Sequence, residues 1–173
     1  NTIFKYLVKK KYHVVGTVRT SKKTAHFQDN LLNNIINFKN INSLTSLKNV
    51  VNSVKPDVVI NCIGVIKQLK TASDPLNIIP VNSLLPNNLN KLCLKQNIRF
   101  IHFSTDCVFD GQLGSYSETD LMTANDLYGI SKYLGEVKGK STVTIRTSII
   151  GHELSSKNGL VEWFLGQKSK IFG

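Results

Sequence analysis

Two residues four apart, Tyr128 and Lys132 in the segment YGISK, could form a proton-transfer pair. On a helix, positions four apart share one face, so the two side chains would be neighbours. A free tyrosine has a pKa of about 10, and an adjacent ammonium lowers this pKa because it favours the phenolate. Such a phenol can give a proton to a carbonyl oxygen or take one from an alcohol. Taken alone, this spacing is more often an exposed pair than a catalytic one.

Hydroxyl groups precede this pair in the segment STDCVFDG, residues 104–111. The apolar segment before it predicts a strand over residues 98–104, which would place Ser104 and Thr105 at the carboxyl end of that strand. Ligands bind at this edge of parallel α/β sheets. Either hydroxyl could hydrogen-bond the substrate oxygen that Tyr128 protonates, and so orient it.

Alternating strands and helices must position these groups. Strands are expected at 12–18, 57–64, 98–104 and 142–150, and helices at 43–54, 125–138, around 85–93 and around 160–165. A further helix at the N-terminus leads straight into the first strand. Pro86 is expected in the first turn of its helix, and Asn125 or Asp126 at the start of another. The pattern predicts one α/β domain over residues 1–173, with a doubly wound, Rossmann-like parallel sheet.

Composition narrows the class of protein. With 173 residues, 41% hydrophobic and 19% charged, the chain is typical of soluble globular domains, and its apolar runs are too short to cross a membrane. The net charge of +11 comes from scattered lysines, which suit an anionic dinucleotide or nucleotide sugar better than nucleic acid. Cys62, Cys93 and Cys107 lack metal-ligand spacing, so we expect reduced, mostly buried thiols in a cytoplasmic protein and no metal site.

The segments STDCVFDG, YSETD and LYGISKYLGE, in this order, resemble the extended short-chain dehydrogenase/reductases. Within them the dTDP-4-dehydrorhamnose reductase branch is the most similar. The segments PDVVINCIG, VNSLLPNNLNKLC and IRTSIIG extend the resemblance over nearly the whole chain. It implies an NADP(H)-dependent reductase of a 4-keto nucleotide sugar, in deoxysugar or surface-polysaccharide synthesis. Hydride would move from nicotinamide to the ketone carbon while Tyr128 protonates the oxygen.

The resemblance also implies a role for each matching residue. Thr105 would bind the substrate carbonyl, Tyr128 would donate the proton, and Lys132 would bind the nicotinamide ribose and lower the pKa of Tyr128. Further cofactor contacts would come from Arg19, Asn61, Cys62, Ile63, Gly64, Asn82 and Ser104, and further substrate contacts from Asp106, Val108 and Phe109. An arginine after the first strand favours NADP(H), with NAD(H) as the alternative.

For four of these residues, a purely structural role remains an alternative to a role in binding. Arg19 could belong to a solvated basic loop, and Asp106 could be a turn residue. Phe109 could be part of the core, and Asn82 could bond locally to backbone.

Two departures from the family pattern bear on activity. No Gly-rich phosphate loop occurs in the sequence, and the chain stops at Gly173 where the family continues into a substrate-binding region. We therefore expect a fragment of a longer reductase, lacking a central strand between those at 12–18 and 57–64, that binds cofactor poorly alone.

Other functions remain as alternatives at this stage. A nucleotide-sugar epimerase or dehydratase would use the same residues, and a non-catalytic subunit, like the reductase-like regulatory subunit of methionine adenosyltransferase, would use none of them for chemistry. A homodimer is compatible with each of these functions.

Overall fold

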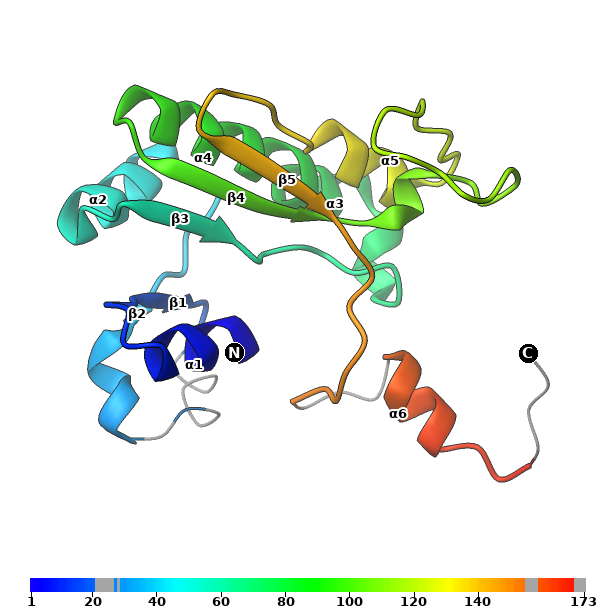
Figure 1. Ribbon diagram of the computed structural model, residues 1–173, viewed down its shortest axis with the longest axis horizontal. Coiled ribbons are helices and arrows are strands. Elements are labelled where there is room, and N and C mark those ends of the chain that lie inside the picture. The colour runs from blue at the N-terminus through cyan, green and yellow to red at the C-terminus, as the bar shows by residue number, and fades with distance from the viewer. Residues whose placement is uncertain (21–26, 28, 155–158, 170–173) are drawn as a thin grey trace. The chain divides into compact units, whose positions relative to one another are not determined.

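The computed structural model describes residues 1–20, 27, 29–154 and 159–169. The chain divides into two compact units, Asn1–Lys55 and Pro56–Gly173. The first unit is coloured blue to cyan in Figure 1, and the second begins with β3.

The first unit is a small α/β unit around a two-stranded parallel sheet. Its elements are α1 (Thr2–Lys9), β1 (Gly16–Val18), a 3₁₀ turn (Asp29–Asn34), β2 (Ile35–Asn37) and α2 (Leu44–Val54). The predicted helix before the first strand is confirmed, but the strand is shorter than 12–18, and β2 was not predicted. The helix predicted at 43–54 is also confirmed, with Ser43 accepting a hydrogen bond from the backbone N–H of Ser46 at its start.

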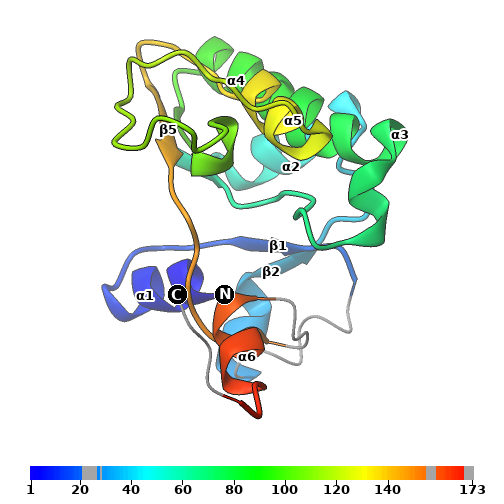
Figure 2. The ribbon, with the colours of Figure 1, turned by 90° about the vertical axis from the view of Figure 1, so that its right-hand side faces the viewer.

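A three-stranded parallel sheet forms the centre of the second unit. Its strands are β3 (Val58–Asn61), β4 (Arg99–Ser104) and β5 (Thr142–Arg146), in the order β3-β4-β5. The helices α4 (Leu85–Lys95) and α5 (Leu127–Leu134) lie along one face of this sheet (Figures 1 and 2). The predicted strands and helices are therefore present, although α5 ends before the expected residue 138. The helix predicted around residues 160–165 is α6 (Leu160–Leu165).

The helix predicted around residues 85–93 is part of a longer helical segment. It begins with α3 (Pro75–Ile79), capped by Asp74, and passes through one π turn (Pro80–Leu84) into α4. Pro86 lies in the first turn of α4 as predicted, but further helical turns precede it. The widened turn brings two successive side chains, Asn82 and Ser83, into the buried side of the segment.

The described residues form two separate parallel sheets instead of one continuous sheet. The predicted α/β class with parallel strands is confirmed: the first unit holds the sheet β1-β2 and the second holds the sheet β3-β4-β5. No helix in the described part of the chain has the length and apolar character needed to cross a bilayer. The expectation for the cysteines is wrong in part: Cys93 is buried, but Cys62 and Cys107 are exposed because they follow strand ends in loops.

Candidate active site

Thr105 and Tyr128 meet at the carboxyl end of β4. Thr105 follows the strand directly and is 6% exposed. Its Oγ1 accepts a hydrogen bond from the backbone N–H of Cys107 (3.2 Å) and donates one to Oδ1 of Asp106 (3.2 Å). Thr105 lies close enough to the phenol of Tyr128 to influence the pKa of that group, although the two residues are 23 positions apart in the sequence.

The first turn of α5 fixes the position of Tyr128. Asp126 caps this helix, since its Oδ1 accepts from the backbone N–H of Gly129 at 2.9 Å. Its Oδ2 binds Nζ of Lys67 at 2.9 Å, which attaches the loop after β3 to the same helix end. Gly129 lets the helix approach closely, because a Cβ there would clash with the carbonyl oxygen of Cys107 and lie 2.5 Å from Cβ of Ala124.

Lys132 lies one turn along α5, buried at 6% exposure. Its Nζ donates at 2.7 Å to the backbone carbonyl of Phe103, which lies in β4 two residues before Thr105. Burial lowers the pKa of Lys132, and the nearby carboxylate of Glu136 opposes that shift.

The expected lowering of the pKa of Tyr128 by Lys132 is not found. Burial raises the pKa of Tyr128 above its ordinary value, and the nearby hydroxyl of Thr105 offsets this only in part. The physical reason is that the ammonium of Lys132 is directed to the Phe103 carbonyl, while the phenol itself is desolvated.

Asn82 organises the loop that follows β3. Its side chain pairs with both backbone groups of Val65, accepting from N–H at 2.8 Å and donating to the carbonyl at 3.0 Å. Its Nδ2 also donates to Oγ of Ser131 on α5 at 3.1 Å. Asn82 therefore does bond to backbone, which was the alternative to a cofactor contact, but its partner lies 17 residues earlier in the chain. Asn82 thereby ties the loop to the helix that carries Tyr128 and Lys132.

The loop after β3 holds the other residues expected to meet a cofactor. Asn61 is buried, its Oδ1 accepts from the backbone N–H of Ile63 (3.1 Å), and its Nδ2 faces Nδ1 of His102 (3.1 Å). Gly64 is exposed, and a Cβ on it would lie 3.5 Å from Oδ1 of Asn82 and 3.9 Å from Nζ of Lys132. These are ordinary contact distances, so the protein's own packing does not require a glycine there.

Several side chains that were expected to contact a ligand contact other groups of the protein instead. Ser104 is buried and donates to Oε1 of Glu136 at 2.7 Å, so it does not replace Thr105. Val108 has no exposed surface, which makes its expected substrate contact wrong: it is a core residue. Asp106 accepts from Oγ of Ser148 at 2.8 Å, and this bond lowers the pKa of its carboxyl group.

Phe109 and Arg19 remain accessible. The Phe109 ring stacks on Tyr116 with centroids 4.3 Å apart. Arg19 is exposed directly after β1 in the first unit, while Lys22 and Lys23, expected to support it, lie outside the described residues.

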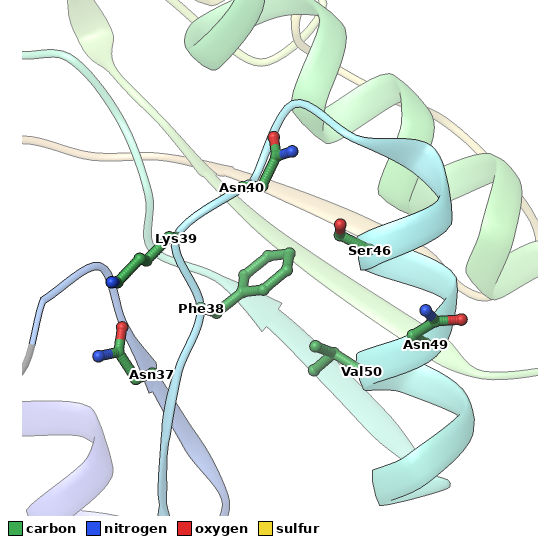
Figure 3. Close-up of a pocket in the computed structure, with 7 residues that line it drawn as sticks. All are labelled: Asn37, Phe38, Lys39, Asn40, Ser46, Asn49 and Val50. Carbon is green, nitrogen blue, oxygen red and sulfur yellow. The ribbon is translucent and has the colours of Figure 1, made fainter.

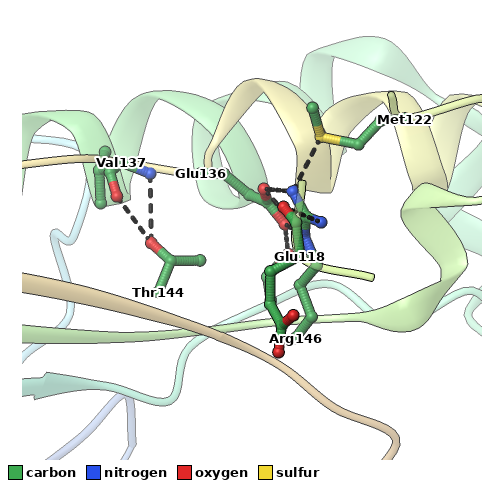
Figure 4. A network of polar contacts seen from close by, with 7 residues as sticks. Glu118, Met122, Glu136, Val137, Thr144 and Arg146 are labelled. Carbon is green, nitrogen blue, oxygen red and sulfur yellow. Dashed lines mark hydrogen bonds and ion pairs between the residues drawn. The ribbon is translucent and has the colours of Figure 1, made fainter. Parts of the chain in front are cut away.

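Glu136 and Arg146 form a bidentate ion pair that sequence reasoning did not assign to the site. Arg146 donates from Nε (2.9 Å) and Nη2 (2.8 Å) to the Glu136 carboxylate, and both side chains are mostly buried (Figure 4). Both residues lie in segments that carry the family resemblance, LYGISKYLGE and IRTSIIG. Their pairing could not be predicted because it depends on where β5 lies relative to the end of α5.

A pocket of about 510 Å³ lies elsewhere, in the first unit, between the end of β2 and α2 (Figure 3). Its lining consists of Asn37, Phe38, Lys39, Asn40, Ser46, Asn49 and Val50. None of these is a predicted site residue, and the pocket is not part of the Thr105–Tyr128 arrangement.

Comparisons with known proteins agree with these features. The RmlD substrate binding domain family matches residues 3–169. The "probable low-salt glycan biosynthesis reductase Agl14" of Haloferax volcanii is 41% identical over 81 residues, which cover 46% of this chain and 27% of that protein. The dTDP-4-dehydrorhamnose reductase of Burkholderia thailandensis is 35% identical over 108 residues, covering 60% of this chain and 36% of that protein.

Solved structures share the fold. The dTDP-4-dehydrorhamnose reductase from Bacillus anthracis, solved in complex with NADP, aligns with a TM-score of 0.66 and 20% identity, covering 88% of this chain and 58% of that one. The chain thus spans only about a third of the two curated relatives described above. With the family match extending over nearly its whole length, the chain belongs to the RmlD substrate-binding domain family, within the extended short-chain dehydrogenase/reductases.

Proposed function

We propose that this chain is the proton-transfer and cofactor-binding part of an NADP(H)-dependent reductase that acts on a 4-keto nucleotide sugar. The observation that carries the proposal is the position of three side chains: Thr105 directly follows β4, Tyr128 lies near it in the first turn of α5, and Lys132 lies one helical turn further. The names of the relatives, reductases of dTDP-4-dehydrorhamnose and of a glycan pathway, support the substrate class.

The side chains divide the work as follows. Tyr128 donates its phenolic proton to the carbonyl oxygen of the substrate, and Thr105 hydrogen-bonds the same oxygen and holds it in line. The raised pKa of Tyr128 keeps the phenol protonated at neutral pH, which suits the reductive direction. The bound nicotinamide supplies the hydride.

The residues present fit the nicotinamide end of such a cofactor. Nζ of Lys132 lies near Gly64, whose missing side chain leaves the loop after β3 open to a ligand. Asn82 fixes that loop through its two bonds to Val65. Arg19 would favour the 2′-phosphate of NADP(H) over NAD(H).

A steady-state assay of the intact protein tests the proposal. NADPH and NADH are offered with dTDP-4-dehydrorhamnose, and loss of the reduced cofactor is followed. Tyr128→Phe is expected to slow turnover on the order of 10²–10⁴-fold, because it removes a general acid and keeps the ring. Tyr133→Phe is the matched control, since Tyr133 is on the same helix and 43% exposed.

The outcomes separate the alternatives. Wild-type rates in the Tyr128→Phe protein would contradict the role of Tyr128 as proton donor. A wild-type protein that neither converts the sugar nor consumes NADPH would favour a non-catalytic subunit. Conversion of the sugar without net NADPH consumption would instead indicate an epimerase or dehydratase that shares the same residues.

A further inference from the structure

One connection beside the candidate site is long and has no regular secondary structure. The segment from Phe109 to Met122, here called the 109–122 loop, leaves the site just after Thr105 and returns just before α5. Its base is closed, because the backbone N–H groups of Thr123 and Ala124 both donate to the carbonyl of Val108 (3.1 and 3.0 Å). Loops of this length in compact domains are usually functional.

The 109–122 loop has its own internal order. The Phe109 and Tyr116 rings are nearly parallel, with an interplanar angle of 6°. The hydroxyl of Tyr116 donates to Oδ1 of Asp110 at 2.6 Å and accepts from the backbone N–H of Leu113 at 3.1 Å. The ring pair is therefore tied to the backbone and side chains of the loop itself.

Arg146 attaches this loop to the sheet. Its guanidinium lies over the Phe109 ring, 5.2 Å from the centroid, in a cation–π arrangement. Its Nη1 donates to the backbone carbonyl of Glu118 (3.3 Å), and its Nη2 contacts Sδ of Met122 (3.3 Å) (Figure 4). One side chain at the end of β5 thus contacts the loop near its start, its middle and its end.

Glu136 fixes that guanidinium and links it to the site. Ser104 and Arg146 are direct partners in the register of β4 and β5. Both donate to the same carboxylate, Ser104 at 2.7 Å and Arg146 through two nitrogens. Ser104 immediately precedes Thr105, so the strand end that holds the catalytic hydroxyl and the arginine that holds the loop share one partner.

We propose that the Glu136–Arg146 pair is a positioning hub, which holds the 109–122 loop and its Phe109–Tyr116 ring pair beside Thr105 as a wall of the substrate site. Neither charged residue touches the reacting atoms. The ring pair determines how the sugar nucleotide is placed, and therefore which carbonyl reaches Tyr128. This inference rests on the proposed function for the substrate class.

The arrangement requires arginine. A planar guanidinium can form two parallel hydrogen bonds to a carboxylate and at the same time lie flat on an aromatic ring, whereas an ammonium is a point charge that cannot reproduce this geometry. Arg146→Lys is therefore expected to lose most of the anchoring, even though it keeps the positive charge.

Two measurements on the intact protein test the hub. The first is hydrogen–deuterium exchange of the 109–122 loop without substrate. Arg146→Met and Arg146→Lys should both speed exchange there, while Arg99→Met should not, since Arg99 is an exposed arginine at the opposite end of β4. The second is the steady-state reduction of dTDP-4-dehydrorhamnose with NADPH. Both Arg146 variants should raise the KM for the sugar nucleotide about tenfold or more, with a much smaller change in kcat.

Phe109→Leu supplies the matching change from the loop side. It keeps apolar volume but removes the ring, and it should raise the KM for the sugar nucleotide. The double variant Phe109→Leu/Arg146→Met should have no higher KM than the single variants, because both changes remove the same interaction. Unchanged exchange of the loop in Arg146→Met would overturn the anchoring, whatever the activity. Faster exchange with unaltered KM would overturn the role in substrate placement. A wild-type protein that reduces no keto sugar would refute the proposed function, and the exchange result would still decide whether Arg146 anchors the loop.

Discussion

Substituting Gly129 by alanine should damage the candidate site without touching any of its functional side chains. Gly129 lies in the first turn of α5, between Tyr128 and the rest of the helix. Its Cα faces the turn at 106–108, and an added Cβ would meet the Cys107 carbonyl oxygen and, at 2.5 Å, Cβ of Ala124. Ordinary contact begins at 3.4 Å, so the added Cβ and Cβ of Ala124 must separate by about 0.9 Å, and the turn that holds the Cys107 carbonyl must move away as well.

The expected magnitudes follow from this displacement. Forcing a methyl group into a packed contact costs about 1–3 kcal/mol. Alanine regains up to about 1 kcal/mol of helix propensity over glycine, so the net loss in the free energy of unfolding is expected at about 1–2 kcal/mol. The effect on turnover should be larger, because a shift of about 1 Å between Thr105 and Tyr128 can slow a positioned reaction on the order of 10²-fold.

Urea denaturation and steady-state kinetics of Gly129→Ala measure the two effects separately. Gly151→Ala is the control, since no atom lies within 4 Å of the Cβ it would add. A Gly129→Ala protein with the stability and the kcat of wild type would refute the reasoning, because the close approach of α5 to the 106–108 turn would then not exist.

Three further predictions concern protonation and capping. Burial lowers the pKa of His102 from 6.5 to about 4, so on acidification the unfolded chain takes up the proton before the folded one does. Lowering the pH from 7 to 4 should therefore cost about 3 kcal/mol in the free energy of unfolding. Urea denaturation should show a weaker pH dependence for His102→Gln than for the wild-type protein. Asp126→Ala removes the helix cap and should lower the free energy of unfolding, measured in urea, by about 1 kcal/mol. Asp126→Ser keeps a cap and loses only the exposed ion pair with Lys67, so its stability should be close to that of the wild type. In an NMR titration with labelled tyrosine, Tyr128 should ionise above its ordinary pKa of 10.0, and ionisation below that value would show that Lys132 does tune the phenol.

The sequence predicts the order of the elements well, because each is defined by local signals. The segment at 57–64 has the β-branched composition of a buried strand and forms β3, and the amphipathic pattern at 43–54 forms α2. Asp126 was one of two expected caps and is the one that bonds Gly129. Strand ends were less predictable, as for β1, because they depend on which neighbouring strand is present to pair with them.

The contacts between motifs were only partly predictable. The pattern suggested that Thr105 and Tyr128 share a site; in the structure Thr105 directly follows β4 and lies near the phenol of Tyr128, and their shared role stays a prediction. It could not indicate that Val108, in the middle of a motif, is fully buried, or that Ser104 turns to Glu136. These outcomes depend on side-chain directions at the end of β4, where the strand passes into a 3₁₀ turn and the alternation of faces stops.

The π turn explains how Asn82, expected from the resemblance to contact the cofactor, bonds to α5 together with Ser83, which the sequence analysis did not single out. Asn82 and Ser83 are adjacent, and in a regular helix they would point in directions about 100° apart, so that one would face solvent. The wider turn lets both face α5, where Asn82 donates to Oγ of Ser131 and Ser83 donates to its backbone carbonyl at 2.7 Å. Gly135 completes this contact, because any side chain there would clash with the Asn82 carbonyl. The helix that carries Tyr128 and Lys132 is thus held at Ser131 by buried polar bonds, which restrict its position more narrowly than apolar packing alone would.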